Sequence, residues 1–490
     1  MRNERTPVLV GAAAVSQRED DPARAREPLA LMGDALERAG KDAGSLALLA
    51  RADAVRVPRG FWDYADPGRA LAERFGAARA RTTLAEVGVL QTTLLGAAAE
   101  DIAAGRADVV LLAGGEARHR AQRARQAGVE AALTRQAPGV APDVVLRPHA
   151  EIISPLEQQV GLAMPVTQYA VIENALRFAE QQTLDAHRDA VAELQARASA
   201  VAAANSDAWD RTPHGAAEIR GPAPGNRMLA FPYTKLHTSQ WNVDQAAGLV
   251  LCSLATARAL GIPAERYVYP LAVADANQML PLAARPALHR VPGFRHAGRR
   301  ALAHAGLGTG DLRHLELYSC FPVAVRVQAR ELGIDEARPL TVTGGMTFAG
   351  GPLNNFVLQA LVKLVERLRT DRGASGLLSA VSGILTKQGV SLWSAQPPER
   401  PFAFFDVTEE TAREQAPLPL VERAEGPAHV AGYTVLCEGE RVARLACICD
   451  LAGGRRTLAA SDDPALAELG MREELAGRSV RLAGGRAELS

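Results

Sequence analysis

The chain has 490 residues, 48% of them hydrophobic, and its 55 lysine and arginine residues are balanced by 55 aspartate and glutamate residues. This length and composition exclude a disordered protein and predict two or three globular domains. The zero net charge gives no support for a nucleic acid or an anionic membrane as partner. We expect neither a membrane span nor export, because no apolar run of about 18 residues and no signal-peptide core is present.

Five cysteines are scattered along the chain without a CxxC pair, at positions 252, 320, 437, 447 and 449. An odd number of isolated thiols is typical of a reduced, cytoplasmic protein. Their spacing does not suit a zinc site, and we expect no bound metal.

The first part of the chain alternates short apolar runs with alanine-rich helical stretches. Residues 8–15 (VLVGAAAV) are typical of a buried strand, and residues 28–39 repeat apolar side chains at helical spacing up to Gly40, a favourable C-cap. A second helical stretch at 91–104 precedes a nearly all-apolar strand, ADVVLLAGGE (107–116), as found in sheets buried on both faces. This alternation predicts an α/β fold.

Between residues 117 and 230 the sequence becomes rich in arginine and alanine. Helical periodicity is clearest at 166–178 and 187–204, and proline and glycine cluster from Pro213 to Gly225. We interpret this region as a mostly helical insertion over the sheet. An insertion of this size is more often functional, such as a lid or a substrate-facing loop, than a mere connection.

The α/β alternation returns at Ala246 and continues to Trp393. A helix followed by ADVVLLAGG in the first half matches a helix followed by ASGLLSAVSG (374–383) in the second. The repeat predicts two similar α/β halves, although the same pairs also fit one doubly wound sheet. After a proline-rich linker, segments that alternate at strand period predict a small antiparallel β domain.

The segment GGMTFAGGPLNN has the frame of the loop that carries the catalytic histidine in thiolases. With three other segments it indicates that the chain resembles the thiolase superfamily over about residues 5–395, and within it the thiolase-like protein type 1 group, often labelled acetyl-CoA acetyltransferase. The segments that carry the resemblance are GLAMPVTQYAVIENALR (161–177), FPYTKLHTSQWNVDQAA (231–247), LYSCFPVAVRV (317–327) and TVTGGMTFAGGPLNN (341–355).

The resemblance implies an α/β fold with a duplicated five-layer αβαβα core, a helical loop insertion and a small additional C-terminal all-β domain. The implied division is an N-terminal thiolase half at 1–116 and 231–250, a loop or lid insertion at 117–230, a C-terminal half at 251–394, a linker at 395–400 and the β domain at 401–490.

Thiolase chemistry, as the resemblance implies it, needs two cysteines and a histidine. The histidine position is Gly351 in this chain. The position of the nucleophilic cysteine, before the second helical stretch, falls on Gly88 or Val89, and the second cysteine falls near Ala380. Gln388 stands where the type 1 group often has a histidine. The usual Cys/His/Cys set is therefore absent, and condensation by the usual route is not expected.

Cys320 and His237 are the remaining candidates for catalysis. Cys320 ends an apolar strand in YSCFP, and ligands bind at strand ends in α/β folds. The same residue equally suits a small buried core position. His237 would act as the base of a nearby thiol, or would be a surface histidine on an irregular loop.

The ligand-binding candidates flank these two residues in the sequence. Lys235 and Ser239 would contact the phosphates or the pantetheine arm of coenzyme A. Asn354 and Asn355 would donate hydrogen bonds to an acyl carbonyl, or would cap the helix that follows. Glycines in the loop would let a ligand approach the backbone closely. These glycines are Gly344, Gly345 and Gly351.

Three functions fit these observations. The first is an acyl-CoA-handling enzyme of lipid metabolism, an acyltransferase by resemblance with altered chemistry. The second is a non-catalytic protein that binds acyl-CoA or a lipid, and the third is a scaffold whose β domain recruits a protein partner. CoA or an acyl-CoA thioester is the expected ligand, with no covalently bound cofactor. Assembly as a homodimer stays open.

Overall fold

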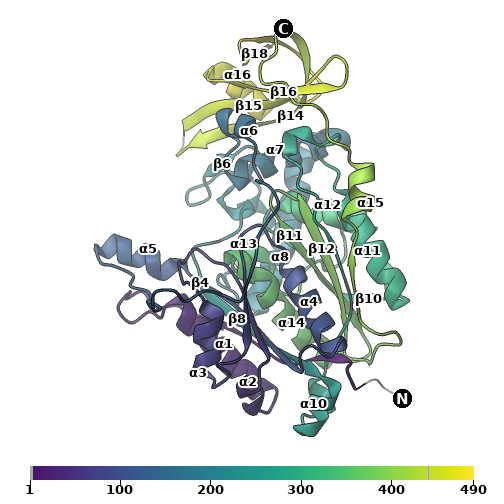
Figure 1. The fold of residues 1–490 in the computed structure, drawn as a ribbon. Helices are drawn as coiled ribbons and strands as arrows, with labels where there is room; N and C mark the ends of the chain where they lie inside the picture. The colour runs from purple at the N-terminus through teal and green to yellow at the C-terminus, as the bar shows by residue number, and fades with distance from the viewer. Residues whose placement is uncertain (1–3, 440, 490) are drawn as a thin grey trace.

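The computed structural model describes residues 4–439 and 441–489. Two mixed sheets form the core of the molecule (Figure 1). In the first sheet the strands lie in the order β1 (Pro7–Ser16), β8 (Asp244–Ser253), β4 (Val109–Ala117), β2 (Ala54–Pro58), β3 (Arg81–Ala85) and β5 (Val144–Leu146). In the second the order is β10 (Leu312–Glu316), β11 (Ser375–Ser382), β12 (Lys387–Ser394), β9 (Tyr269–Ala276) and β13 (Ala403–Asp406).

Two buried helices fill the space between the sheets, α4 (Gln91–Ala103) and α14 (Phe356–Thr370), and each contacts strands of both. On the outer face of the first sheet lie α1 (Pro28–Asp42) and α3 (Pro67–Arg74). The outer face of the second is covered by α11 (Pro292–Ala305). Helix, sheet, helix, sheet and helix thus form five layers, which confirms the predicted αβαβα core. Each half contributes one of the central helices, which accounts for the repeat in the sequence.

Most of the remaining helices cover one end of this core. Helix α12 (Pro322–Leu332) packs beside α11 and against the insertion, and α15 (Thr408–Glu414) also packs on α11. The insertion contains α5 (Arg118–Ala127), α6 (Pro155–Gln159), α7 (Pro165–Ala179), α8 (Leu184–Ala204) and α9 (Ala216–Ile219). Short elements are α2 (Ala47–Ala50), α10 (Leu254–Ala259), α13 (Gly345–Phe348), β6 (Met228–Ala230) and β7 (Tyr233–Thr234).

The C-terminal strands close into a small barrel, at the top of Figure 1 above α7 and β6. Strand β14 pairs with β15 on one side and β17 on the other, and β16 pairs in parallel with β18. The resulting order, β14-β15-β16-β18-β17, with a helix between β16 and β17, is the Greek-key topology of an OB-fold. The elements are β14 (Gly426–Glu438), β15 (Arg441–Leu451), β16 (Arg455–Ser461), α16 (Pro464–Arg472), β17 (Ser479–Ala483) and β18 (Arg486–Leu489).

The barrel is docked firmly on α7. Arg177 of α7 pairs with Glu474 at 2.8 Å and donates to the Tyr433 hydroxyl at 3.0 Å. The Asn174 amide donates to the Tyr433 carbonyl at 2.8 Å. Because Arg177, Asn174 and Tyr433 are buried and hydrogen-bonded, these contacts hold the barrel in one orientation on the core.

Two strand pairings cross the domain divisions expected from the sequence. Strand β13 lies beyond residue 401 but pairs with β9 in the core, and β6 of the insertion pairs with β14 of the barrel. The division itself stays a prediction. Within the described part of the chain, no helix combines the length and apolar character needed to cross a membrane.

Candidate active-site region

The glycine loop is a rigid wall held by one buried carboxylate. Glu316, at the end of β10, accepts hydrogen bonds from the backbone N–H groups of Val342 at 2.7 Å and Thr343 at 2.9 Å. The hydroxyls of Thr341 and Thr343 also donate to it, each at 2.9 Å. Burial raises the pKa of Glu316 to about 7, although these hydrogen bonds oppose the shift. The turn that follows needs the left-handed backbone of Gly344, at φ 101°.

Ser239 packs against Gly351, the position at which thiolases carry the catalytic histidine. A Cβ atom added at Gly351 would lie 2.0 Å from Ser239 Oγ and 3.2 Å from Met346 Cε. The Ser239 N–H donates to the Cys320 carbonyl at 3.1 Å, which fixes this residue between Cys320 and the glycine loop. A histidine would therefore fit at 351 only if Ser239 moved.

The position of the missing nucleophile is closed as well. Gly88 lies just before α4 with φ 105°, and a Cβ atom there would approach Pro148 Cγ to 2.9 Å. The Gly88 carbonyl accepts a hydrogen bond from Lys387 Nζ at 2.7 Å. Val89 is buried too. This helix end has lost both the thiol and the open space in front of it.

Cys320 is a buried thiol in its neutral form. It lies between β10 and α12, hydrogen-bonded to the side chain of Tyr169. Burial raises the pKa of the thiol to about 12, against the smaller opposing effect of the Tyr169 hydrogen bond. The Tyr169 ring stacks on Phe321 with the ring centroids 4.5 Å apart. A thiol in this state is a poor nucleophile, because the thiolate is the reactive form.

His237 is also buried and neutral. Its Nδ1 atom accepts a hydrogen bond from the Thr234 N–H at 3.1 Å, and its Nε2 atom has no hydrogen-bond partner. Burial lowers the pKa of the imidazole to about 4. Among the described residues, no hydrogen bond joins His237 to Cys320. The structure therefore does not bring these two candidates together as a thiol and its base.

The two asparagines have different environments. Asn354 links the halves: its Oδ1 atom accepts from Gln91 Nε2 at 3.0 Å, and its Nδ2 atom donates to the Arg59 carbonyl at 2.7 Å. Asn355 takes the N-cap position of α14, but its side chain makes no capping hydrogen bond, so the alternative of a side-chain cap is wrong. Both polar atoms of its side chain are buried without a partner.

Lys235 and Ser239 line one cavity of about 470 Å³, between the core and the insertion. Arg18 and Trp209, which the sequence analysis missed, lie on its wall, with the Arg18 guanidinium carbon 4.6 Å from the centre of the Trp209 ring. Ser239 connects this cavity to Cys320 and Gly351. Nothing in the local sequence marks Arg18 or Trp209, because they meet only in the folded chain.

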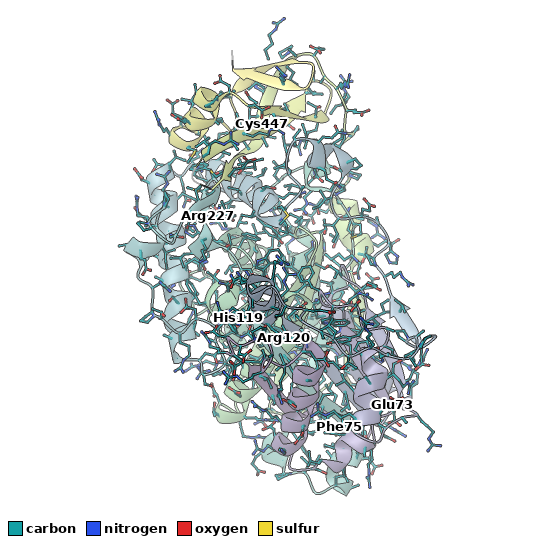
Figure 2. All side chains as sticks on the ribbon, turned by 90° about the vertical axis from the view of Figure 1, so that its left-hand side faces the viewer. Glu73, Phe75, His119, Arg120, Arg227 and Cys447 are labelled. Carbon is teal, nitrogen blue, oxygen red and sulfur yellow. The ribbon has the colours of Figure 1, made fainter. Side chains whose placement is uncertain are left out.

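Three of the other cysteines, Cys252, Cys447 and Cys449, are buried in strands β8 and β15. Figure 2 shows Cys447 in the barrel, well separated from His119 and Arg120 of α5. Cys449 is buried with it in the interior of the barrel, and Cys252 is buried in the first sheet. Within the described residues, no three histidine, cysteine, aspartate or glutamate side chains are grouped to hold a metal ion.

Comparison with known proteins agrees with this architecture. Over 153 residues the chain is 32% identical to an acetyl-CoA acetyltransferase of Pseudomonas aeruginosa, a match covering 31% of this chain and 36% of that protein. A crystal structure of a monomeric SCP2-thiolase-like protein type 1 from Mycobacterium smegmatis has a TM-score of 0.85 and 27% identity, and the match covers 100% of both chains. The chain belongs to the thiolase superfamily. This confirms the resemblance inferred from the sequence segments.

A second solved structure shares the fold over most of the chain. The structure of an Ltp2–ChsH2(DUF35) aldolase has a TM-score of 0.61 and 18% identity, covering 80% of this thiolase-superfamily chain and 98% of that chain. At this identity the likeness concerns the fold alone. No protein-family model matches the chain. The curated acetyltransferase is matched over little more than a third of its length, so its activity does not transfer directly.

Proposed function

We propose that this thiolase-superfamily protein binds a coenzyme A thioester in the cavity of about 470 Å³. In this proposal Lys235 and Arg18 face the phosphates, because both are cations on the cavity wall. The pantetheine arm runs to Ser239, and the thioester lies beside Cys320 and Gly351. The observation that carries the proposal is the position of Ser239, which lines the cavity and also contacts both the Cys320 carbonyl and the glycine loop.

The geometry favours binding without the usual thiolase chemistry. The helix end that would bear the nucleophile is covered by Pro148, and the thiol of Cys320 has a raised pKa and no paired base. We therefore propose an acetyl-CoA acetyltransferase-related protein that holds acyl-CoA with altered chemistry or none. The second candidate is acyl transfer onto Cys320, favoured by its hydrogen bond with Tyr169. The five free cysteines support the proposal of a reduced, cytoplasmic setting.

Calorimetric titration tests the binding proposal. We expect heat on addition of CoA or acetyl-CoA to the full chain. Lys235→Ala should bind roughly ten- to a hundredfold more weakly, since one charge-assisted hydrogen bond is worth about 1.5–3 kcal/mol. Lys41→Ala is the matched control, because Lys41 is an exposed lysine paired with Glu37 on α1, away from the cavity. The proposal is wrong if CoA, acetyl-CoA and a long-chain acyl-CoA all give no heat.

A further inference from the structure

One fully buried arginine has no acidic partner. Arg285 follows a short 3₁₀ turn (Leu282–Ala284) and is 1% exposed. One of its terminal nitrogens donates to the Ile384 carbonyl, and the other, Nη1, makes no hydrogen bond. Within the described chain no carboxylate lies within 4.0 Å of its guanidinium. Burial lowers its pKa to about 10, which still leaves it charged at neutral pH.

Most of the other buried arginines pair with a carboxylate, whereas the buried Arg120 donates only to the backbone carbonyls of Ala25 and Ala132. Arg177 is equally buried but pairs with Glu474 at 2.8 Å, and Arg326 pairs with Glu173, Glu180 and Glu336. Removing a charge from water is costly unless it is paired, so buried arginines are normally compensated in this way. Arg285 has no such contact pair, so its buried Nη1 donor is open to a hydrogen-bond acceptor from outside the chain.

Glu157 is the acidic residue near Arg285, and both of its carboxylate oxygens already accept hydrogen bonds from backbone N–H groups. Burial lowers the pKa of Arg285, and the nearby Tyr169 and Glu157 oppose that shift to a smaller extent. One Glu157 oxygen accepts from the Ala283 N–H at 2.9 Å, and the other from the Ser154 N–H at 2.7 Å. Glu157 therefore fixes the backbone before Arg285 and does not fill the position opposite Nη1.

Arg285 lies where two parallel strands of the second sheet end. It is bonded to Ile384, just after β11, and the Tyr169 hydroxyl donates to the adjacent Gly383 carbonyl at 3.3 Å. Tyr169 is also the partner of Cys320, which follows β10. The carboxyl ends of parallel strands are the usual ligand sites of α/β folds. Tyr169 thus connects Arg285 to Cys320, and through Ser239 to the cavity.

A loop of the insertion packs against Gly88 and Gly383. Pro148 lies over Gly88, and Ile152 Cγ2 would be 3.1 Å from a Cβ atom at Gly383. The loop between these two residues spans the end of β11 and the end of α4.

We infer that Arg285 binds the terminal carboxylate of a dicarboxylic acyl chain carried by coenzyme A. The inference rests on the proposed function, which places the thioester beside Cys320, with Tyr169 and Arg285 beyond it along the acyl direction. A guanidinium matches the geometry of a carboxylate, and its free Nη1 supplies the donor. The ligand class is therefore an acyl-CoA with an acidic end, in contrast to a plain fatty acyl-CoA.

The barrel holds this arginine in place. Arg456 of β16 donates to the Arg285 carbonyl and to the Ala283 carbonyl, the latter at 3.2 Å, while its own charge is paired with Asp450 at 2.7 Å. The OB-like domain is in this way a positioning element for the carboxylate site.

The aromatic content of this domain does not suit nucleic-acid binding. Between residues 426 and 490 the one aromatic residue is Tyr433, and its side chain is buried, so the domain offers no stacking surface for bases.

The test compares matched pairs of ligands on the full chain. Calorimetry is run with succinyl-, glutaryl- and adipyl-CoA against butyryl-, valeryl- and hexanoyl-CoA. We expect at least one acidic ligand to bind roughly ten- to a hundredfold more tightly than its neutral partner, the range of one charge-assisted contact. In Arg285→Met this preference is lost and the neutral ligand binds as before. Arg285→Lys keeps the positive charge but not the planar guanidinium, so this variant should retain part of the preference for the acidic ligand.

Controls separate this role from a structural one. Arg177→Met removes a paired buried arginine, so this variant should melt at a lower temperature than the wild type while still preferring acidic ligands. Arg285→Met should melt at or above the wild-type temperature. Equal affinity for acidic and neutral ligands in the wild type, or a preference that survives Arg285→Met, overturns the inference and leaves the proposed function intact. If no CoA thioester binds, the proposed function is wrong. In that case free glutarate is the remaining probe. If glutarate stabilises the wild type but not Arg285→Met, the carboxylate site is still supported. If glutarate does not stabilise the wild type, the inference is overturned.

Discussion

The end of helix α4 and the ends of strands β10 and β11 lie in the same core but differ in what they offer a ligand. At the helix end, Gly88 is covered by Pro148 and its carbonyl is bonded to Lys387. At the strand ends lie the thiol of Cys320 and the Nη1 atom of Arg285, which has no hydrogen-bond partner. In the proposed function, the position of the thiolase nucleophile is closed while the neighbouring strand ends still hold the ligand.

The glycine loop belongs to the strand-end region in this comparison. Its backbone is anchored by Glu316, and its former histidine position accommodates Ser239. Because two backbone N–H groups and two hydroxyls donate to this one carboxylate, the loop keeps its shape without a catalytic side chain. In the proposed function this loop is a wall of the ligand site, and the packing of Ser239 against Gly351 leaves little space for a histidine side chain there.

The largest expected effect is a pH-dependent change in stability at the strand-end region. The folded-state pKa of Glu316 is about 7, above its ordinary value of 4.5, so the folded chain holds this proton longer than the unfolded chain. Stability therefore falls as the pH rises from about 4.5 to 7. The difference in unfolding free energy between wild type and Glu316→Gln should shrink by on the order of 2–4 kcal/mol across this window.

Denaturant unfolding of the two proteins at pH 4.5, 6 and 7.5 measures that difference. Glu331→Gln is a suitable control, because Glu331 is a buried carboxylate paired with Arg290 at 2.6 Å. A difference between wild type and Glu316→Gln that does not vary with pH would show that the loop is not anchored by a carboxyl with a raised pKa.

A smaller effect is expected at the helix end when a thiol is restored there. In Gly88→Cys the new side chain has a strained backbone and meets Pro148, so we expect a loss of roughly 1–3 kcal/mol and slow alkylation of the thiol. Gly44→Cys is the matched control, since Gly44 also has a positive φ, 79°, but no atom within 4 Å of the added Cβ. If iodoacetamide alkylates the new thiol of the Gly88→Cys variant as fast as that of the Gly44→Cys variant, the helix end is open and the comparison fails.

The smallest expected signal concerns Cys320 itself. With a thiol pKa of about 12 and full burial, it should show no measurable alkylation at pH 7 under conditions that label the half-buried Cys437. Incubation with labelled acetyl-CoA, followed by digestion and mass spectrometry, should likewise give no acyl adduct. An adduct on Cys320 would favour the second candidate function, in which this thiol is acylated.

Much of the fold could be predicted because its signals are local and long. The apolar runs, the matched halves and the GGMTFAGGPLNN frame each lie within one continuous stretch. The closed barrel could not be predicted from the sequence, because the parallel contact of β16 with β18 joins segments separated by α16. The alternating pattern of those strands fits an open antiparallel sheet equally well.

The candidate site was predictable only where single residues sit in a recognisable segment. Lys235 and Ser239 follow one another in such a segment and line one cavity. Pro148 and Arg285 lie in stretches without periodicity, so their positions over Gly88 and beside Ile384 depend on how the insertion and the barrel pack. A contact of that kind has no signature in the local sequence.

The most direct test of the central claim is a crystal structure of the full chain with a non-hydrolysable acyl-CoA analogue. We expect the phosphates between Arg18 and Lys235, and the thioester carbon beside Ser239 and Cys320. An analogue whose thioester is ordered against the start of α4 at Gly88, or one bound outside this cavity, would contradict it.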